Sequence, residues 1–403
     1  MREMKDSGVE WIGEIPKNWK ICRLKDYAHI CNGRDYSEVL DENGDYPVIG
    51  SGGQFAKACE PLYQKESVLL GRKGTIDKPL FVDYPFWTVD TMYYTEIKEN
   101  VSAKYFYYLC TQIEFDFYQY GSAVPSMTQR DLYNVNFPYP TLDEQRRIAN
   151  YLDRKCSQID TIIAQQQEVI EKLKAYKLSV ITEAVTKGLN PDVPMKDSGV
   201  EWIGEIPEHW DFRRIKNCCL IVDCKNRTPD PDPDGEYIVV RTTCIRDGSF
   251  SYEGSYHTNA ENFKEWTAKG QPQHGDIFFT REAPMGEACL VPDTDNLCMG
   301  QRVMFFRPLD GSDPRYILYS IYGPLAREYI DSKNKGSTVG HLKLGQVASL
   351  PLFYCPPREQ SEIANYLDKR CGAIDKVVEK KAEIISRITD YKKSLIYEVV
   401  TGK

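Results

Sequence analysis

The chain has 403 residues, 41% of them hydrophobic, which is enough for two or three folded domains. Its net charge of −8 argues against a protein that coats nucleic acid regardless of sequence, because phosphate affinity comes from concentrated Lys and Arg. With 13 cysteines but no Cys-x-x-Cys, no long apolar run and no signal peptide, we expect a cytoplasmic protein with reduced thiols, no metal site and no membrane contact.

Two sequence elements frame the chain, and each occurs twice. The opening MKDSGVEWIGEIP, Met4 to Pro16, returns unchanged as Met195 to Pro207, 191 residues later. The closing element, Glu144-Gln145 with Ile148 to Asp153, recurs 215 residues later as Glu359-Gln360 with Ile363 to Asp368. The middles of the two copies differ. This is the pattern expected when one framework carries two separately specified binding surfaces, and it does not suggest a duplicated enzyme.

The first block, residues 1–142, offers candidate DNA contacts on two loops. Base edges are read by side chains such as Arg, Lys, Asn and Gln, while phosphates favour Lys, Arg, Ser and Thr. A glycine-containing turn after the strand-like Val68 to Leu70 carries Arg72, Lys73 and Thr75, and a loop that begins near Tyr120 carries Ser122, Gln129 and Arg130. The alternatives are surface salt bridges and simple turns.

We predict a long helix over residues 143–187, since no proline or glycine interrupts the sequence from Asp143 to Thr186. Apolar residues recur at alternating steps of four and three, which is a heptad seam. The seam residues are Ile148, Leu152, Ile159, Ile163, Ile170 and Leu173, with Gln166 and Lys177 at polar seam positions. Gly188, Pro191 and Pro194 end this helix and form a linker over 188–194.

The second block, residues 195–357, has gained 24 residues between the repeated elements. We expect most of them in a loop-like insertion around Asn226 to Gln273, because Pro229, Pro231 and Pro233 alternate with aspartates. The candidate DNA contacts of this block are Arg241, Thr243, Arg246, Arg281, Ser337, Thr338, His341 and Lys343. Arg281 matches Arg72 of the first block.

Residues 358–403 repeat the helix and its seam. The seam residues here are Ile363, Leu367, Ile374, Val378, Ile385 and Ile388, with Lys381 and Lys392 in place of Gln166 and Lys177. Each helix of about 44 residues would be a rod of roughly 65 Å. If the two rods pack antiparallel, they act as a ruler that fixes the separation of the two blocks. A coiled coil that serves dimerisation or adaptor assembly is the alternative.

The doubled Trp-Ile-Gly-Glu-Ile-Pro-x-x-Trp opening, the Pro-x-x-x-Glu-Gln-x-x-Ile-Ala-x-x-Leu-Asp element at Pro140 to Asp153, and the helix after it resemble the specificity subunits of type I restriction-modification systems. The resemblance covers essentially the whole chain; the second copy departs from it at Cys355, which stands where the proline is expected. It implies a mixed α/β fold with two target recognition domains related by a pseudo-two-fold and separated by two long antiparallel coiled-coil helices.

The same resemblance implies a function without catalysis. Each domain would read one half of a split double-stranded DNA sequence, and the helices would dock two modification (methyltransferase) subunits, with restriction subunits also in the complex. S-adenosylmethionine, ATP and Mg²⁺ would bind those partners and not this chain.

No motif in the sequence argues for catalysis by the chain itself. The nearest string to an adenine methyltransferase motif is Asn136-Phe137-Pro138-Tyr139, where proline does not follow the asparagine. No cofactor-binding Gly-x-Gly-x-x-Gly or Walker motif occurs. A nuclease built on Asp83 or Asp90 with Glu96 and Lys98, and a structural adaptor whose blocks bind proteins, remain as rival hypotheses.

Overall fold

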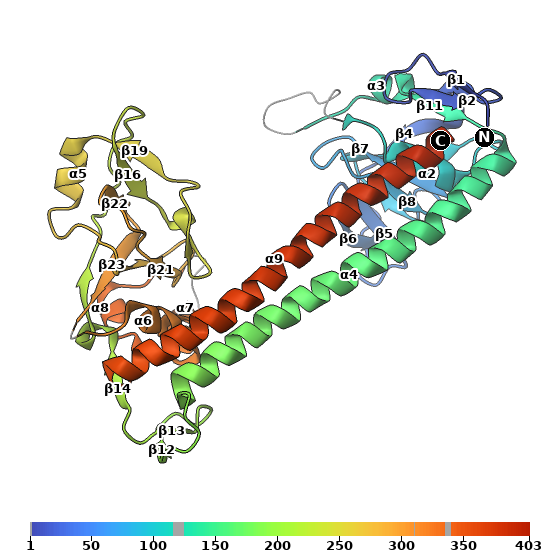
Figure 1. Cartoon of the computed structure of the whole chain (residues 1–403). Coiled ribbons are helices and arrows are strands. Elements are labelled where there is room, and N and C mark those ends of the chain that lie inside the picture. The colour runs from blue at the N-terminus through green and yellow to red at the C-terminus, as the bar shows by residue number, and fades with distance from the viewer. Residues whose placement is uncertain (1, 116–124, 310, 335–339) are drawn as a thin grey trace. The chain divides into compact units, whose positions relative to one another are not determined.

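The computed structural model describes residues 2–115, 125–309, 311–334 and 340–403. The chain forms two compact units, one of Met1–Gln167 with Ala382–Lys403 and the other of Glu168–Lys381. Each unit is a mixed α/β domain joined to parts of two long helices (Figure 1). The predicted fold class, two mixed α/β domains with long antiparallel helices, is confirmed.

The first unit contains four small sheets. Its elements are β1 (Met4–Asp6) paired with β2 (Glu14–Pro16); β3 (Lys20–Arg23) paired with β11 (Asn136–Tyr139); a four-stranded sheet in the order β4 (Ala28–Asn32), β10 (Met92–Ile97), β7 (Ser67–Gly71), β8 (Leu80–Val82); a three-stranded sheet in the order β6 (Gly53–Ala58), β5 (Tyr46–Gly50), β9 (Trp87–Thr88); and helices α1 (Leu24–Tyr27), α2 (Ala103–Cys110) and α3 (Gln129–Asn134). The continuous apolar run of β7 makes it a fully buried central strand.

The second unit repeats every one of these sheets in the same strand order. Its elements are β12 (Met195–Asp197) with β13 (Glu205–Pro207); β14 (Asp211–Arg214) with β24 (Pro351–Tyr354); β15 (Cys219–Val222), β23 (Val303–Pro308), β20 (Ile277–Thr280), β21 (Ala288–Leu290); β19 (Tyr256–Thr258), β16 (Tyr237–Val240), β22 (Leu297–Met299); a short 3₁₀ turn at Ile215–Asn217; and helices α6 (Pro314–Tyr322), α7 (Pro324–Asn334) and α8 (Leu344–Ala348). The repeat seen at the ends of the sequence therefore extends through the divergent middles.

The residues that lengthen the second copy lie within the predicted range, Asn226 to Gln273, but they form regular elements, so the loop-like character expected of the insertion is wrong. The Pro229 to Pro233 segment is irregular, but it adds no length, because β16 still lies 191 residues after β5. Between β16 and β19 the chain adds a 3₁₀ turn (Thr242–Cys244) and the hairpin of β17 (Ile245–Arg246) with β18 (Ser249–Phe250), and between β19 and β20 it adds α5 (Ala260–Trp266).

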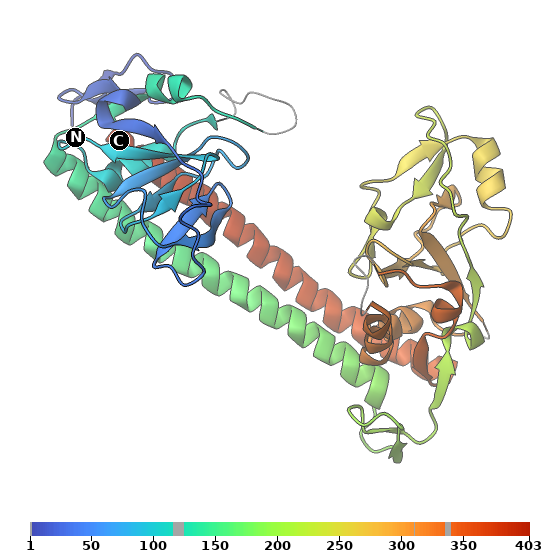
Figure 2. The same cartoon turned by 180° about the vertical axis from the view of Figure 1, so that it is seen from behind.

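The long helices are α4 (Leu142–Lys187) and α9 (Pro357–Thr401), drawn green and red in Figure 1 and seen side by side again from behind in Figure 2. They run antiparallel in each unit. In the first unit, Lys392 donates to Asp160 at 2.6 Å, and in the second, Lys177 donates to Asp375 at 2.8 Å. These are the same pair in the two copies, and they explain why lysine stands at those two seam positions. All twelve apolar seam residues are buried or half-buried.

The repeated closing element joins each helix to its domain. Gln145 is fully buried at the start of α4, where it accepts from the Ser102 amide at 2.9 Å and donates to the Pro140 carbonyl at 3.1 Å. Gln360 makes the equivalent bonds from α9, to the Asp313 amide at 3.0 Å and the Cys355 carbonyl at 2.7 Å. The glutamine therefore satisfies buried backbone groups at both joints.

The repeated aspartate secures the next turn of each helix. Asp153 accepts from Lys104 at 2.5 Å and from the Tyr108 hydroxyl at 2.8 Å. Asp368 accepts from Arg315 at 2.7 Å and from the Tyr319 hydroxyl at 2.9 Å.

Among the described residues, no helix combines the length and the apolar character that a membrane span requires.

Candidate nucleic-acid interface

The turn after β7 is held between two neighbouring segments of the first unit. The Arg72 amide donates to the Thr91 carbonyl at 2.9 Å, and the Met127 amide donates to the Arg72 carbonyl at 3.0 Å. Gly71 is required here, because a Cβ at that position would lie 2.4 Å from the Ile76 Cα. The Met127 segment leads to the predicted contacts Gln129 and Arg130, so the fold brings the Arg72 turn and the residues after Pro125 together.

The cations of this turn are available to a ligand. The Arg72 guanidinium lies 5.8 Å from the centre of the Tyr93 ring and donates to the Asp90 carbonyl at 3.4 Å, and no carboxylate among the described residues pairs with it. Lys73 lies 3.9 Å from Asp90, with both side chains more than half exposed. Such an exposed pair is weak, so a phosphate or base edge could replace it.

The remaining candidates of the first unit lie nearby or outside the described residues. Gln129 donates to the Asn32 side chain at 3.2 Å from the first turn of α3, whose N-terminus is capped by Thr128. Arg130 follows it and is exposed, while Thr75 is half-buried in the Arg72 turn. Ser122 lies outside the described residues.

The second unit holds the equivalent turn in the same backbone frame. The Arg281 amide donates to the Arg302 carbonyl at 3.0 Å, and the Leu342 amide donates to the Arg281 carbonyl at 3.0 Å. The Arg281 side chain, however, is only 12% exposed and donates to Asp223 at 2.9 Å. Arg72 and Arg281 therefore share a backbone position but not a side-chain environment.

A polar cluster surrounds Arg281. Its Nε donates to the Leu342 carbonyl at 3.2 Å and its Nη2 lies 3.3 Å from His341 Nε2. Glu282 lies 3.0 Å from His341 Nδ1 and 2.6 Å from Arg302 Nε. Glu282 stands where the first unit has Lys73, so the same turn carries opposite charges in the two copies.

The added elements of the second unit hold three predicted contacts. Arg241 and Thr243 are exposed at the 3₁₀ turn, where Arg241 donates to the Gly254 carbonyl at 3.4 Å. Arg246 is exposed on β17 opposite Ser249. Lys343 is exposed just before α8, and Ser337 and Thr338 lie outside the described residues.

Several residues of this surface were not predicted from the sequence. Arg302, Gln301 and Asn226 lie beside the Arg281 turn. Lys225 and Arg227 both lie over the Trp266 ring, at 4.8 and 4.7 Å from its centre, and both pair with Glu265. The Gly300-Gln301-Arg302 sequence is itself a glycine-containing polar turn, which is the signal that could have identified Arg302.

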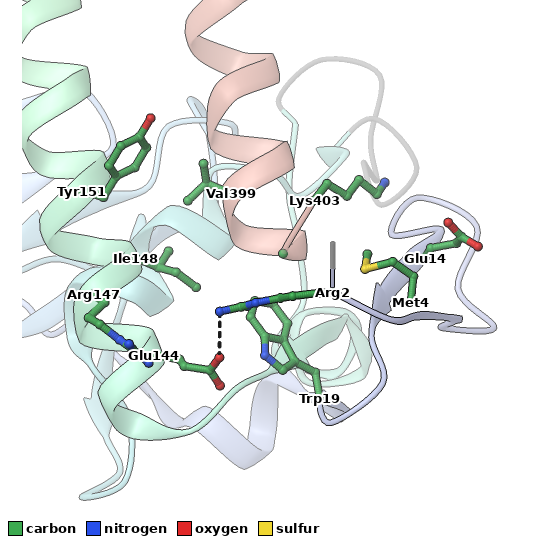
Figure 3. Close-up of a pocket in the computed structure, with 11 residues that line it drawn as sticks. Arg2, Met4, Glu14, Trp19, Glu144, Arg147, Ile148, Tyr151, Val399 and Lys403 are labelled. Atoms are coloured by element: carbon green, nitrogen blue, oxygen red, sulfur yellow. Dashed lines mark ion pairs between the residues drawn. The ribbon is translucent and has the colours of Figure 1, made fainter.

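A cavity of about 740 Å³ belongs to the framework of the first unit (Figure 3), and none of its lining residues belongs to the Arg72 turn. It lies where the N-terminal strands meet the start of α4 and the end of α9, and Arg2 pairs with Glu144 there at 3.4 Å. The indole nitrogen of buried Trp19 has no hydrogen-bond partner among the described residues. In the second unit the equivalent Trp210 donates to Glu359 at 3.0 Å.

The string nearest to a methyltransferase motif lies in a strand of the first unit. Asn136 to Tyr139 form β11, where the Pro138 carbonyl accepts from Tyr105 at 3.0 Å in the core. Among residues 2–115, 125–309, 311–334 and 340–403, no group of three or more His, Cys, Asp or Glu side chains could hold a metal ion.

Comparison with known proteins identifies a family. The family model described as "Type I restriction modification DNA specificity domain" matches residues 16–172 and 207–385. The MjaVIII type I restriction enzyme specificity subunit of Methanocaldococcus jannaschii is 21% identical, over 96% of this chain and 93% of that protein. The EcoDI specificity subunit of Escherichia coli is 17% identical, over 97% of this chain and 90% of that protein.

One solved structure shares the fold over nearly the whole length. It is a chain from a study of complex assembly and conformational transition of the type I restriction-modification system, with a TM-score of 0.66 and 14% identity over 96% of this chain and 98% of that one. At this identity the likeness supports the fold alone.

Proposed function

Because the chain belongs to the family of type I restriction-modification DNA specificity domains, we propose that it reads a two-part DNA sequence and recruits modification and restriction subunits to it. It is a specificity subunit, the component that recognises the DNA sequence. We propose further that it has no active site of its own, and that S-adenosylmethionine, ATP and Mg²⁺ bind its partners.

A two-part target is supported by one observation above all. The two units share a backbone frame, but the turn at its centre carries Lys73 in one and Glu282 in the other. Base edges differ in their donors and acceptors, so side chains of opposite charge at one position select different bases. The two domains should therefore read different half-sites.

Recruitment of two modification subunits is supported by an apolar edge on the helix pair. In the first unit, Ile162 and Tyr391 each directly precede a seam residue, and in the second unit Val377 and Tyr176 do the same. In an antiparallel pair, these positions of both helices lie along one edge of the seam. All four side chains are exposed, and Tyr176 reaches across to Arg370 on α9, whose Nη2 donates to its hydroxyl at 3.3 Å.

The other edge of the same helix pair is polar. It carries Asp160, Lys174 and Asp375, which are exposed. Exposed aromatic and β-branched side chains gathered along one edge are typical of a surface that another helix covers. Each unit has one copy of this edge, which fits two copies of one partner.

The sequence-reading function is tested by co-expression with a cognate modification subunit and mapping of methylated adenines in host DNA. We expect a motif of two half-sites with a fixed gap. A single contiguous motif would contradict the two-part target. The absence of new methylation, together with equal affinity for all duplexes in the presence of partners, would favour the structural adaptor.

Recruitment is tested on each edge separately. The double variant Ile162→Glu with Tyr391→Glu should reduce the modification subunits bound per chain from two to one in native mass spectrometry, because it places charges on one apolar edge. Gln165→Glu, at an exposed position of α4, is the matched control and should still bind two. Two subunits bound to the double variant would contradict the assignment of this edge.

A further inference from the structure

A small cavity of about 230 Å³ lies beside the Arg281 turn of the second unit, and all its lining residues are polar. They are Asn226, Arg281, Glu282, Gln301, Arg302 and His341. A concave site lined only by hydrogen-bonding side chains suits a polar ligand group.

A chain of charged and polar contacts fixes the side chains of this cavity. Asp223 pairs with Arg281 at 2.9 Å, and Arg281 Nη2 donates to His341 Nε2 at 3.3 Å. Since His341 accepts at Nε2, its proton lies on Nδ1, which donates to Glu282 at 3.0 Å. Glu282 in turn forms an ion pair with Arg302, whose Nε lies 2.6 Å from Glu282 Oε1. Arg302 is thus positioned through four successive contacts before any ligand arrives.

The two arginines of this chain differ in the donors they have left. Arg281 uses Nε and both terminal nitrogens, on the Leu342 carbonyl, Asp223 and His341. The Arg302 Nε lies 2.6 Å from Glu282, its two terminal nitrogens make no hydrogen bond to a described residue, and its side chain is 45% exposed. Two free N–H groups in a fixed fork are what reads the O6 and N7 acceptors of guanine.

The charge of the site favours a base edge over a phosphate. Arg281 and Arg302 are balanced by Asp223 and Glu282, so the cluster is close to neutral with His341 uncharged. Phosphate binding depends on cations without acidic partners, whereas a base edge is neutral and is matched by placed donors and acceptors.

We propose that this cavity is the base-reading site of the second domain, with Arg302 contacting a guanine edge in the major groove. The inference rests on the proposed function and names the residue that carries it out in one half-site. Glu282 is a positioning residue, which holds Arg302 in place. In the first unit the position of Arg302 is occupied by Thr91 and that of Glu282 by Lys73, so the effect is confined to the second half-site.

The test uses the full chain in complex with its modification subunits, on duplexes in which each base pair of the second half-site is varied in turn. Arg302→Ala should weaken binding to the cognate duplex roughly 10-fold and abolish the preference for G·C at one position. The slope of affinity against salt concentration should stay unchanged. Arg302→Lys, which keeps the charge without the fork, should lose the same preference.

Glu282→Gln tests the positioning role. It should reduce the preference at the same base pair, and the double variant Glu282→Gln with Arg302→Ala should be no worse than Arg302→Ala alone, since both act on one contact. Arg358→Ala is the matched control, because Arg358 also pairs with a glutamate but lies exposed at the start of α9. It should leave the preference intact.

Two results would overturn the proposal. One is an equal loss of affinity for every duplex with the salt slope reduced by about one, which is the behaviour of a phosphate contact. The other is an Arg302→Ala complex with unchanged preference at every position. An unaltered complex that shows no sequence preference at all would instead refute the proposed function, so the two failures are distinguishable.

Discussion

We expect the Gln360 side chain to contribute strongly to the free energy of unfolding of the second unit. Its amide is fully buried and satisfies two backbone groups, the Asp313 amide and the Cys355 carbonyl. Gln360→Leu keeps the side-chain size but leaves both groups without a partner. A buried polar group that loses its hydrogen bond costs about 1–3 kcal/mol, so we expect a loss of roughly 2–5 kcal/mol in the free energy of unfolding.

The assay combines urea denaturation with hydrogen exchange at the Asp313 amide, which should become unprotected in Gln360→Leu. Gln145→Leu should have a similar effect in the first unit, because Gln145 makes the equivalent two bonds. Gln158→Leu is the control, since Gln158 is exposed on α4. A change at Gln360 within about 0.5 kcal/mol of the control would refute the reasoning.

Two further predictions compare residues of one type that differ in burial or in their partners. Arg281→Ala should lower the free energy of unfolding by roughly 2–4 kcal/mol, because it leaves the Asp223 carboxylate without its cation. Arg72→Ala should change the free energy of unfolding by less than about 0.5 kcal/mol. Equal effects of the two variants in denaturant titrations would contradict this difference. Burial raises the pKa of the Cys298 thiol to about 12, so at pH 8 it stays protonated and unreactive. Iodoacetamide should therefore modify exposed Cys59 first, as mass spectrometry can measure, and reaction of Cys298 in the folded chain at an equal rate would contradict the burial.

The framework could be predicted from the sequence because local periodicity and exact repetition encode it. The seam of α4 and α9 follows from residues three and four apart, and such spacing depends little on the rest of the fold. The function of Gln145 and Gln360 did not follow, although both were noticed. Their partners lie up to 47 residues away in the sequence, so only the folded chain shows that they hold backbone groups.

The sequence predicted where the candidate contacts lie in the two copies, but it did not predict which side chains surround them. Arg72 and Arg281 were correctly matched across the copies. Whether an arginine is free depends on a carboxylate from a distant strand, and Asp223 lies 58 residues before Arg281. The first unit has Asn32 at the position of Asp223, and an amide cannot neutralise a guanidinium. The difference between Asn32 and Asp223 therefore leaves Arg72 without a carboxylate partner and gives Arg281 one.

The insertion lies in the predicted range, but its structure was predicted wrongly for a related reason. Proline and aspartate alternation identifies irregular chain, and Pro229 to Pro233 are irregular, but irregularity does not indicate added length. The gained residues are instead paired in a hairpin and wound into α5, whose Trp266 is buried under Lys225 and Arg227. Short strands and a two-turn helix carry little periodic signal, so tertiary packing decides them.

The two copies differ most in the side chains that the shared backbone frame does not need for its stability. Gln360 and Asp368 satisfy buried or partly buried groups at the joint with α9, and Gln145 and Asp153 do the same at the joint with α4. A change at these positions therefore costs stability in either copy. Backbone hydrogen bonds already hold the frame of the Arg281 turn, and those bonds do not depend on residue type. Lysine can therefore become glutamate at that turn without loss of the fold, provided that a neighbouring cation such as Arg302 balances the charge. If the two domains read separate half-sites as proposed, charge compensation within each turn, more than backbone geometry, limits which half-sites this framework can be changed to read.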